Sequence, residues 1–162
     1  MKKISNLVLA SLVMVACQNP SSEKESNTKA KDDSQAASTE ETNTNQPPAV
    51  PENAKVFFAN LQDGDTLSSP FLVEFGIEGM EVEPAGAVNE GKGHHHIIIN
   101  NQFIEFGGTV PSDSVNIHYG KGQTSDSLDL NPGKYSLTMQ FADGYHRSYG
   151  KQLSSTIKVV VK

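Results

Sequence analysis

The stretch Gly93-His94-His95-His96-Ile97-Ile98-Ile99-Asn100 decides the fold, because three histidines run directly into three isoleucines. Consecutive β-branched residues favour a strand, in which successive side chains point to opposite faces. One face then carries His95 with the first and third isoleucines and is predicted to face the core. The other face carries His94 and His96, whose stems are expected about 6 to 7 Å apart, a spacing that suits chelation of a metal ion.

Residues 55–162 are predicted to form one all-β domain around this strand. Three segments, 71–77, 135–141 and 157–161, place an apolar residue at every second position, as half-buried strands do. Two weaker strands are predicted at residues 56–60 and 125–130. The alternation predicts a core that includes Phe75, Leu137, Met139, Phe141, Ile157 and Val159.

Short turns separate these segments and set the fold class. Asn100-Asn101 is expected to turn the histidine strand into a hairpin partner at residues 102–106, because Asn tolerates positive φ. Asp63-Gly64, Gly107-Gly108 and Asp143-Gly144 mark further turns. The spacing predicts a single antiparallel immunoglobulin-like β-sandwich of about seven or eight strands, without the Cys and Trp of a true antibody domain.

Residues 1–17 are predicted to be a lipoprotein signal peptide. Met1-Lys2-Lys3 is a basic start, and residues 4–15 form an apolar run that is too short to span a bilayer. The run ends in Leu12-Val13-Met14-Val15-Ala16-Cys17, which resembles the lipobox of bacterial lipoproteins. The resemblance implies that Cys17, the only cysteine, is lipidated and that the membrane is a partner through this anchor.

Lipidation predicts a location in the cell envelope. Gln18 stands where an aspartate retains many lipoproteins at the inner membrane, which favours the outer membrane, facing the periplasm or the surface. An ordinary signal peptide with an incidental cysteine, or a membrane anchor, is the alternative at this stage.

Residues 18–54 are predicted to be a disordered polar tether. The segment has no aromatic residue, and Val50 is its only large aliphatic side chain. It therefore buries too little apolar surface to offset the entropy of ordering. Its expected role is to hold the domain away from the membrane, with Pro47-Pro48 and Pro51 stiffening the end next to the domain.

Several other kinds of chemistry are excluded. The net charge of −6 argues against a nucleic-acid partner, and no Ser-His-Asp order or nucleophile elbow is present. The run Gly120-Lys121-Gly122-Gln123-Thr124 lacks the upstream glycine and the following helix of a phosphate-binding loop. It is predicted to be a turn, so structural roles are assigned to Gly93, His95, Gly120, Gly122, Gln123 and Thr124.

The histidines are the strongest functional signal, since all five lie in the second half of the chain. Imidazole is a common ligand for Zn²⁺ and Cu²⁺. We predict that His94 and His96 form a chelating pair that His118 or His146 completes, and that the ion is copper or zinc. Met80 and Met139 are possible soft ligands for Cu⁺, although the alternation puts Met139 in the core.

Two other interpretations of the histidines stay open at this point. The cluster could be a hydrogen-bonded polar group at the edge of the sandwich. His95 alternates with isoleucines and is therefore interpreted as a core histidine with its hydrogen bonds satisfied.

A set of short motifs runs along the domain and carries a family resemblance. The motifs are Asp63-Gly64-Asp65-Thr66, Ser69-Pro70-Phe71, Phe75-Gly76, Gly79-Met80, residues 93–99, residues 118–124 and residues 130–137. With them, residues 56–161 resemble the uncharacterised bacterial domain-of-unknown-function family 4399. The family often has an acidic residue where Asn100 stands, and prolines after the Asp-x-x-His that residues 143–146 keep. It has no established activity, so the resemblance implies the domain and the location of the site only.

Three function classes follow from the sequence. The first is a membrane-anchored, extracytoplasmic lipoprotein that binds a metal ion and is not an enzyme. The second is an interaction module with a structural histidine cluster and an unknown protein partner. The third is a small zinc enzyme, because His-x-His on a strand with a distant His resembles the zinc ligands of carbonic anhydrase. In that case Glu90 or Asp143 would be the acid or base.

Overall fold

The computed structural model describes residues 45–162, and these residues form an all-β domain. Its strands are β1 (Lys55–Phe58), β2 (Thr66–Leu67), β3 (Phe71–Glu78), β4 (Glu81–Val82), β5 (Lys92–Ile99), β6 (Asn116–His118), β7 (Ser125–Leu128), β8 (Gly133–Ala142) and β9 (Ser154–Val161). A single turn of 3-10 helix, η1 (Lys151–Leu153), precedes β9.

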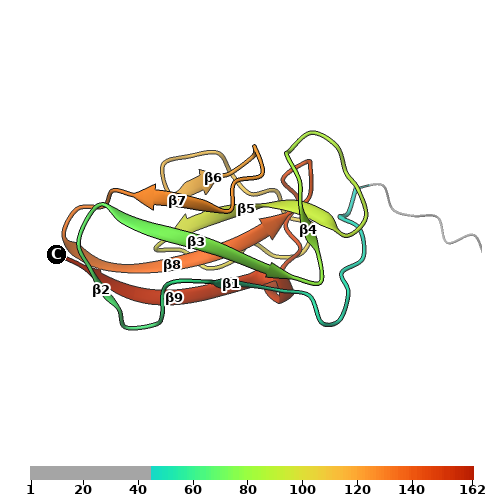
Figure 1. Ribbon diagram of the computed structural model, residues 1–162. Coiled ribbons are helices and arrows are strands. Elements are labelled where there is room, and N and C mark those ends of the chain that lie inside the picture. The colour runs from blue at the N-terminus through green and yellow to red at the C-terminus, as the bar shows by residue number, and fades with distance from the viewer. Residues whose placement is uncertain (1–44) are drawn as a thin grey trace, which may run out of the picture. The chain divides into compact units, whose positions relative to one another are not determined.

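The strands form two sheets, which Figure 1 shows as two layers. One sheet has the order β1-β3-β7, and the other has the order β2-β9-β8-β5-β4, with β6 paired to β5. The predicted all-β sandwich is confirmed. Among residues 45–162 there are nine strands instead of seven or eight, and the two-residue strands β2 and β4 pair in parallel with β9 and β5.

The core lies between the two layers, where the alternation predicted it. Val73 and Phe75 of β3 are buried, whereas Leu72 and Glu74 between them are exposed. On the opposite sheet β8 and β9 contribute the rest of the predicted set. All six predicted core residues are less than 9% exposed, namely Phe75, Leu137, Met139, Phe141, Ile157 and Val159. The strand register inferred from period two is therefore correct.

The strand β5 is buried on both faces, which the alternation did not predict. Its inner face, with His95, packs between the sheets, and its outer face carries His94, His96 and Ile98 at 1% exposure or less. The segment between β5 and β6 covers this outer face. Ile104 N donates to the Oε1 atom of Gln140 on β8, and Val110 is buried. A long connection thus provides a second, outer packing layer over β5.

The predicted hairpin partner at residues 102–106 is wrong, because these residues form no strand. Asn100 does adopt the expected positive φ of 58°. However, its side-chain Oδ1 accepts a hydrogen bond from Ser136 N of β8, and its own N donates to Ser136 O. Asn100 therefore ties the end of β5 to β8, and the strand that pairs with β5 antiparallel is β6.

The domain begins before Lys55, the boundary that the sequence predicted. Pro47 and Ala54 are buried, and Val50 packs against the core cluster. Gln152 Nε2 donates to Pro51 O at 2.7 Å. The last ten residues of the predicted tether, 45–54, therefore contact the domain, because even a few apolar side chains gain free energy where a core edge is open to receive them.

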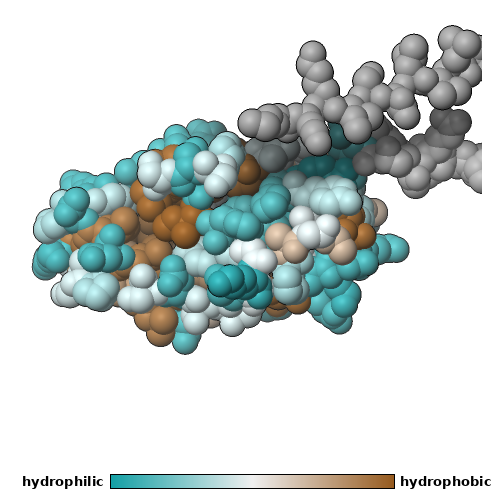
Figure 2. Space-filling view, turned by 90° about the horizontal axis from the view of Figure 1, so that it is seen from above, coloured by the Kyte–Doolittle hydropathy of each residue, from teal (hydrophilic) through white to brown (hydrophobic). Residues whose placement is uncertain are grey.

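The surface of the domain is mixed in polarity. On the face in Figure 2, apolar patches are separated by polar residues. The exposed large apolar side chains of the domain are Leu72, Phe106, Val115 and Tyr145. Residues 45–162 contain no helix long and apolar enough to cross a membrane. The predicted signal peptide, Cys17 and residues 18–44 of the predicted tether lie outside the described residues.

Candidate metal centre

Strand register brings three of the predicted histidines together. His94 and His96 project from the outer face of β5, as their i, i+2 spacing predicted. In the antiparallel pair β5–β6, His96 lies directly opposite His118. Directly opposed residues on neighbouring strands share a face, so the His118 side chain meets the pair from the side.

The fourth histidine comes from the turn that follows β8. His94 is paired with Ala142, the last residue of β8, so the turn after Ala142 passes close to the end of β5. His146 lies in this turn with a φ of 64°, a left-handed conformation that few non-glycine residues adopt. Its N donates to Asp143 O, and its O accepts from Val110 N, both at 2.9 Å.

The four imidazoles lie close together, with their Nε2 atoms in two short pairs. His94 Nε2 and His96 Nε2 lie 3.0 Å apart, and His118 Nε2 and His146 Nε2 lie 3.1 Å apart. The ring nitrogens offered by His94, His96 and His118 all lie within 4.8 Å of one another. The ring centroid of His146 is 5.0 Å from that of His94 and 4.6 Å from that of His118. The structure thus brings all four predicted ligands into one cluster.

The cluster has a buried half and an accessible half. His94 and His96 are at most 1% exposed, whereas His146 is partly exposed and His118 is exposed. The Nδ1 atoms of His94 and His96 are buried without a hydrogen-bond partner among the described residues, so each ring meets its neighbours through Nε2. An ion would therefore reach the buried pair from the side of His118 and His146.

Burial keeps the buried pair neutral near pH 7. It lowers the pKa of His94 from 6.5 to about 4, helped by repulsion from His146 and His118 and opposed by attraction to Asp143. Burial, followed by repulsion from His94, lowers the pKa of His96 further still. Burial and the neighbouring His146 also lower the pKa of His118. Neutral imidazole is the form that binds a metal ion, so the protonation state suits ligation.

Two of the nitrogen–nitrogen separations in the cluster are close to those around a first-row divalent ion. Zn–N bonds are about 2.0–2.1 Å long, which in a tetrahedral site puts ligand nitrogens about 3.3–3.4 Å apart. The Nε2 pairs at 3.0 and 3.1 Å need only a small outward shift to reach that separation. Met80 and Met139 belong to the apolar core cluster, so the donors gathered here are all imidazoles.

The loop after β6 holds His118 in place. A side chain at Gly120 would collide with the His118 ring, and a side chain at Gly93 would collide with Ala142 O and Phe141. The loop itself is fixed by two contacts. Gln123 Oε1 accepts from Lys121 N at 2.8 Å, and Thr124 O accepts from Phe75 N at 2.8 Å. The structure therefore contains the turn predicted for residues 120–124.

Gly122 shows a second reason for glycine in this loop. Its φ is 77°, which a residue with a side chain adopts only under strain. Its N donates to Tyr119 O and closes the turn directly after β6. The glycines thus shape the approach of His118 to the pair on β5.

His95 is a core residue, as the alternation predicted, but its hydrogen bonds are not satisfied. It is fully buried, and its ring lies 5.3 Å from that of Phe75 and 4.9 Å from that of Phe141. Both of its ring nitrogens lack a hydrogen-bond partner among the described residues. The apolar environment lowers the pKa of His95 from 6.5 to about 4. An interior lined by aromatic rings offers no acceptor, which the sequence pattern could not reveal.

The two acidic residues considered for catalysis differ in burial. Glu90 is exposed. Asp143 is fully buried, and its carboxylate accepts from Tyr145 N, Arg147 N and Arg147 Nε. Two surface grooves, lined by Lys134 and Val159 and by Phe103 and Thr156 among others, contain none of the five histidines.

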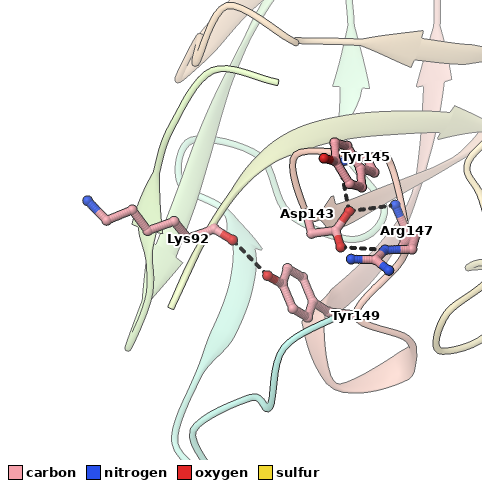
Figure 3. A network of polar contacts seen from close by, with 5 residues as sticks. All are labelled: Lys92, Asp143, Tyr145, Arg147 and Tyr149. Carbon is pink, nitrogen blue, oxygen red and sulfur yellow. Dashed lines mark hydrogen bonds and ion pairs between the residues drawn. The ribbon is translucent and has the colours of Figure 1, made fainter. Parts of the chain in front are cut away.

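Arg147 is the residue of this site that sequence reasoning missed. It forms a buried ion pair with Asp143, 2.7 Å between Nε and Oδ2, across the turn that carries His146 (Figure 3). An acid and a base four residues apart around a Gly-containing turn, as in Asp143-Gly144-Tyr145-His146-Arg147, are the only sequence signal for it.

A comparison with protein families matches residues 73–162 to the family described as Domain of unknown function (DUF4399). The matched segment contains all four clustered histidines, as well as Asp143 and Arg147. Neither the curated proteins nor the solved structures contain a match to the chain.

Proposed function

The chain belongs to the DUF4399 family, a domain of unknown function, and we propose that this domain binds a copper or zinc ion through His94, His96, His118 and His146. The observation that carries the proposal is the close approach of their Nε2 atoms in two pairs, at 3.0 and 3.1 Å. Four nitrogen donors and no thiolate suit Cu²⁺ and Zn²⁺, which are bound readily by imidazole.

The set of imidazole ligands and the pairing of Asp143 with Arg147 support metal binding in place of catalysis. A catalytic zinc keeps an open position next to an acid or base. Ligation by all four proposed imidazoles would leave no position open on a tetrahedral ion, and the carboxylate of Asp143 is engaged by Arg147. The expected role is therefore capture, storage or delivery of the ion, with no reaction at the site.

A structural histidine cluster is the second candidate, and the same short contacts favour it. Two neutral imidazoles 3.0 Å apart can share a proton as donor and acceptor. In that case the domain is an interaction module whose partner is a protein, and metal ions leave its stability unchanged.

Thermal melting of tag-free protein decides between these candidates. An ion that binds only the folded state stabilises it by about 2.7 kcal/mol at a hundredfold excess over its dissociation constant. For a domain of this size, the melting temperature should rise by about 10 °C with Cu²⁺ or Zn²⁺. His96→Ala should abolish this rise, because the buried pair then lacks one nitrogen.

His95→Ala is the matched control, since His95 is the neighbour of both ligands but faces the core. It should lower the melting temperature with and without metal and leave the difference between the two unchanged. If neither ion raises the wild-type melting temperature, the metal proposal is wrong and the interaction module remains.

We also propose that lipidated Cys17 anchors the protein in the cell envelope, with the outer membrane as the favoured location. The lipobox-like run before Cys17 and the polar segment after it support this proposal. An anchored domain would present its histidine cluster to ions in the periplasm or at the surface. Nucleic acid is not an expected partner, given the net charge of −6.

Replacing Cys17 by serine tests the anchor. The native protein should partition with membranes into detergent, because several acyl chains hold it there. The serine variant should be soluble or keep its signal peptide, which is visible as a larger mass. Equal membrane retention of both proteins, at equal mass, would show that Cys17 carries no lipid.

A further inference from the structure

We infer that the buried ion pair between Asp143 and Arg147 is the positioning element that makes His146 the fourth ligand of the centre. The inference rests on the proposed metal binding and adds to it a pair of residues that touch no ion themselves. It also divides the ligands into three that the sheet positions and one that depends on this turn.

The three sheet ligands need no help from Asp143. His94 and His96 stand on β5, and His118 lies opposite His96 in the ladder between β5 and β6. Ladder hydrogen bonds of two strand pairs fix their backbones. His146 lies outside the strands, in the connection between β8 and η1, and its backbone is held by hydrogen bonds to Asp143 O and from Val110 N.

The Asp143 carboxylate closes this connection into a rigid turn. Oδ1 accepts from Tyr145 N at 2.9 Å and from Arg147 N at 3.0 Å, and Oδ2 accepts from Arg147 Nε at 2.7 Å. The backbone adds a hydrogen bond from Asp143 N to Arg147 O at 3.0 Å. Figure 3 shows Asp143 pointing into the turn toward Arg147. The two residues that enclose His146 are thus joined by side chain and backbone.

The conformation of His146 requires contacts such as these between Asp143 and Arg147 to hold it. Its φ of 64° is a left-handed conformation that costs a non-glycine residue free energy and persists only where the surroundings enforce it. Neighbouring contacts share this work. Gly86 N donates to Gly144 O at 2.9 Å, and a side chain at Gly144 would collide with the backbone of Ala87.

Because the ion pair is buried, the loss of either member should disrupt the turn that holds His146. The Asp143 side chain is 0% exposed and that of Arg147 is 11% exposed. Removing either partner breaks this buried ion pair, which is strongly unfavourable. The turn should then rearrange, and His146 is the ligand that moves. A separate hydrogen bond at the same end of the sheet, from Tyr149 OH to Lys92 O of β5 at 2.7 Å, does not involve Asp143 (Figure 3).

Titration with Co²⁺, followed by visible absorption of the purified protein, tests this role. Four-coordinate Co²⁺ absorbs far more strongly than five- or six-coordinate Co²⁺, and its band positions shift when a water replaces an imidazole. The spectrum therefore reports both the coordination number and the loss of one imidazole. In Asp143→Asn an amide donor faces Arg147 Nε, so the contact between residues 143 and 147 should be lost and the turn should rearrange. We expect its spectrum to match that of His146→Ala, with Co²⁺ affinity reduced 10- to 100-fold in both.

Two further variants complete the design. The double variant Asp143→Asn/His146→Ala should bind no more weakly than His146→Ala alone, because both changes remove the same ligand. Arg147→Lys keeps the charge but not the Nε–H geometry, and it should give an intermediate spectrum even if Asp143→Asn fails to fold. Glu78→Gln, which breaks the exposed pair with Lys55, is the matched control and should behave as wild type.

The outcomes separate this inference from the proposed function. Wild-type protein that binds no Co²⁺ refutes metal binding itself. If the wild type binds while Asp143→Asn and Arg147→Lys keep its spectrum and affinity, only the positioning role is refuted. The positioning role also fails if His146→Ala leaves the spectrum unchanged, since three histidines then form the whole site.

Discussion

Replacing Phe141 by alanine is expected to lower the free energy of unfolding by about 3–5 kcal/mol, the range for deletion of a large buried aromatic side chain. Phe141 is 0% exposed and lies between the ring of His95, at 4.9 Å, and the ring of Tyr149, at 6.1 Å. Both neighbours belong to well-packed segments, so the cavity is expected to collapse only in part. Urea unfolding of both proteins at pH 7.5 measures the difference.

Leu72→Ala is the control for this prediction. Leu72 is 51% exposed on β3, so its truncation should change the free energy of unfolding by no more than about 0.5 kcal/mol. A loss above about 2 kcal/mol for Leu72→Ala with a near-neutral Phe141→Ala would contradict the assignment of the sheet faces. It would mean that the strand register is shifted by one residue, which moves each side chain to the opposite face.

Acid is expected to unfold the metal-free domain between about pH 6 and pH 4. Burial lowers the pKa of His95, like that of His94, from 6.5 to about 4. The contribution of His95 is fully present above pH 6.5, where the residue is neutral in both states. It is lost progressively as the pH falls from 6.5 to about 4, because in this range the unfolded chain binds a proton that the folded domain excludes.

The size of this effect follows from the shift. One pKa unit corresponds to about 1.4 kcal/mol, so His95 alone accounts for about 3 kcal/mol between pH 6.5 and its folded pKa of about 4. His94 and His96 change in the same direction. Together they can remove a large share of the 5–15 kcal/mol typical of a small domain.

Urea unfolding at pH 7.5, 6.5, 5.5 and 4.5, in the presence of a chelator, measures this dependence. His95→Leu removes one titrating group from an apolar site, so the fall in stability with pH should become shallower by about one proton. Stability that stays constant from pH 7.5 to 4.5 would contradict the burial of neutral histidines. A slope that His95→Leu leaves unaltered would show that His95 is not one of the titrating groups.

The sequence by itself determined the sheet and one of its faces. In residues 93–100, β-branched residues favour a strand over a helix, and the two-residue period then places His95 inward and His94 with His96 on the opposite face. The same period in β3, β8 and β9 identified the core correctly. Local patterns suffice here because the direction of a strand side chain depends on its own backbone and not on distant contacts.

Only the tertiary structure decided what covers the second face of β5 and which strand pairs with it. Residues 102–106 have a strand-like sequence, yet Asn100 is tied to Ser136 and the pairing partner is β6. Pairing of segments far apart in sequence depends on competition between alternative partners across the whole chain, which no local period encodes. For the same reason the packing of Val50 against the core could not be read from a polar segment.

The composition of the histidine cluster shows the same division. The i, i+2 spacing determined the pair His94 and His96, because both stand on one strand. His118 joins them only through the register of β6 on β5. His146 joins them only because a turn beyond β8 holds it in a left-handed conformation. The sequence therefore supplied the donors, whereas the distances between donors from different elements were fixed by sheet pairing and by the turn enclosed by Asp143 and Arg147.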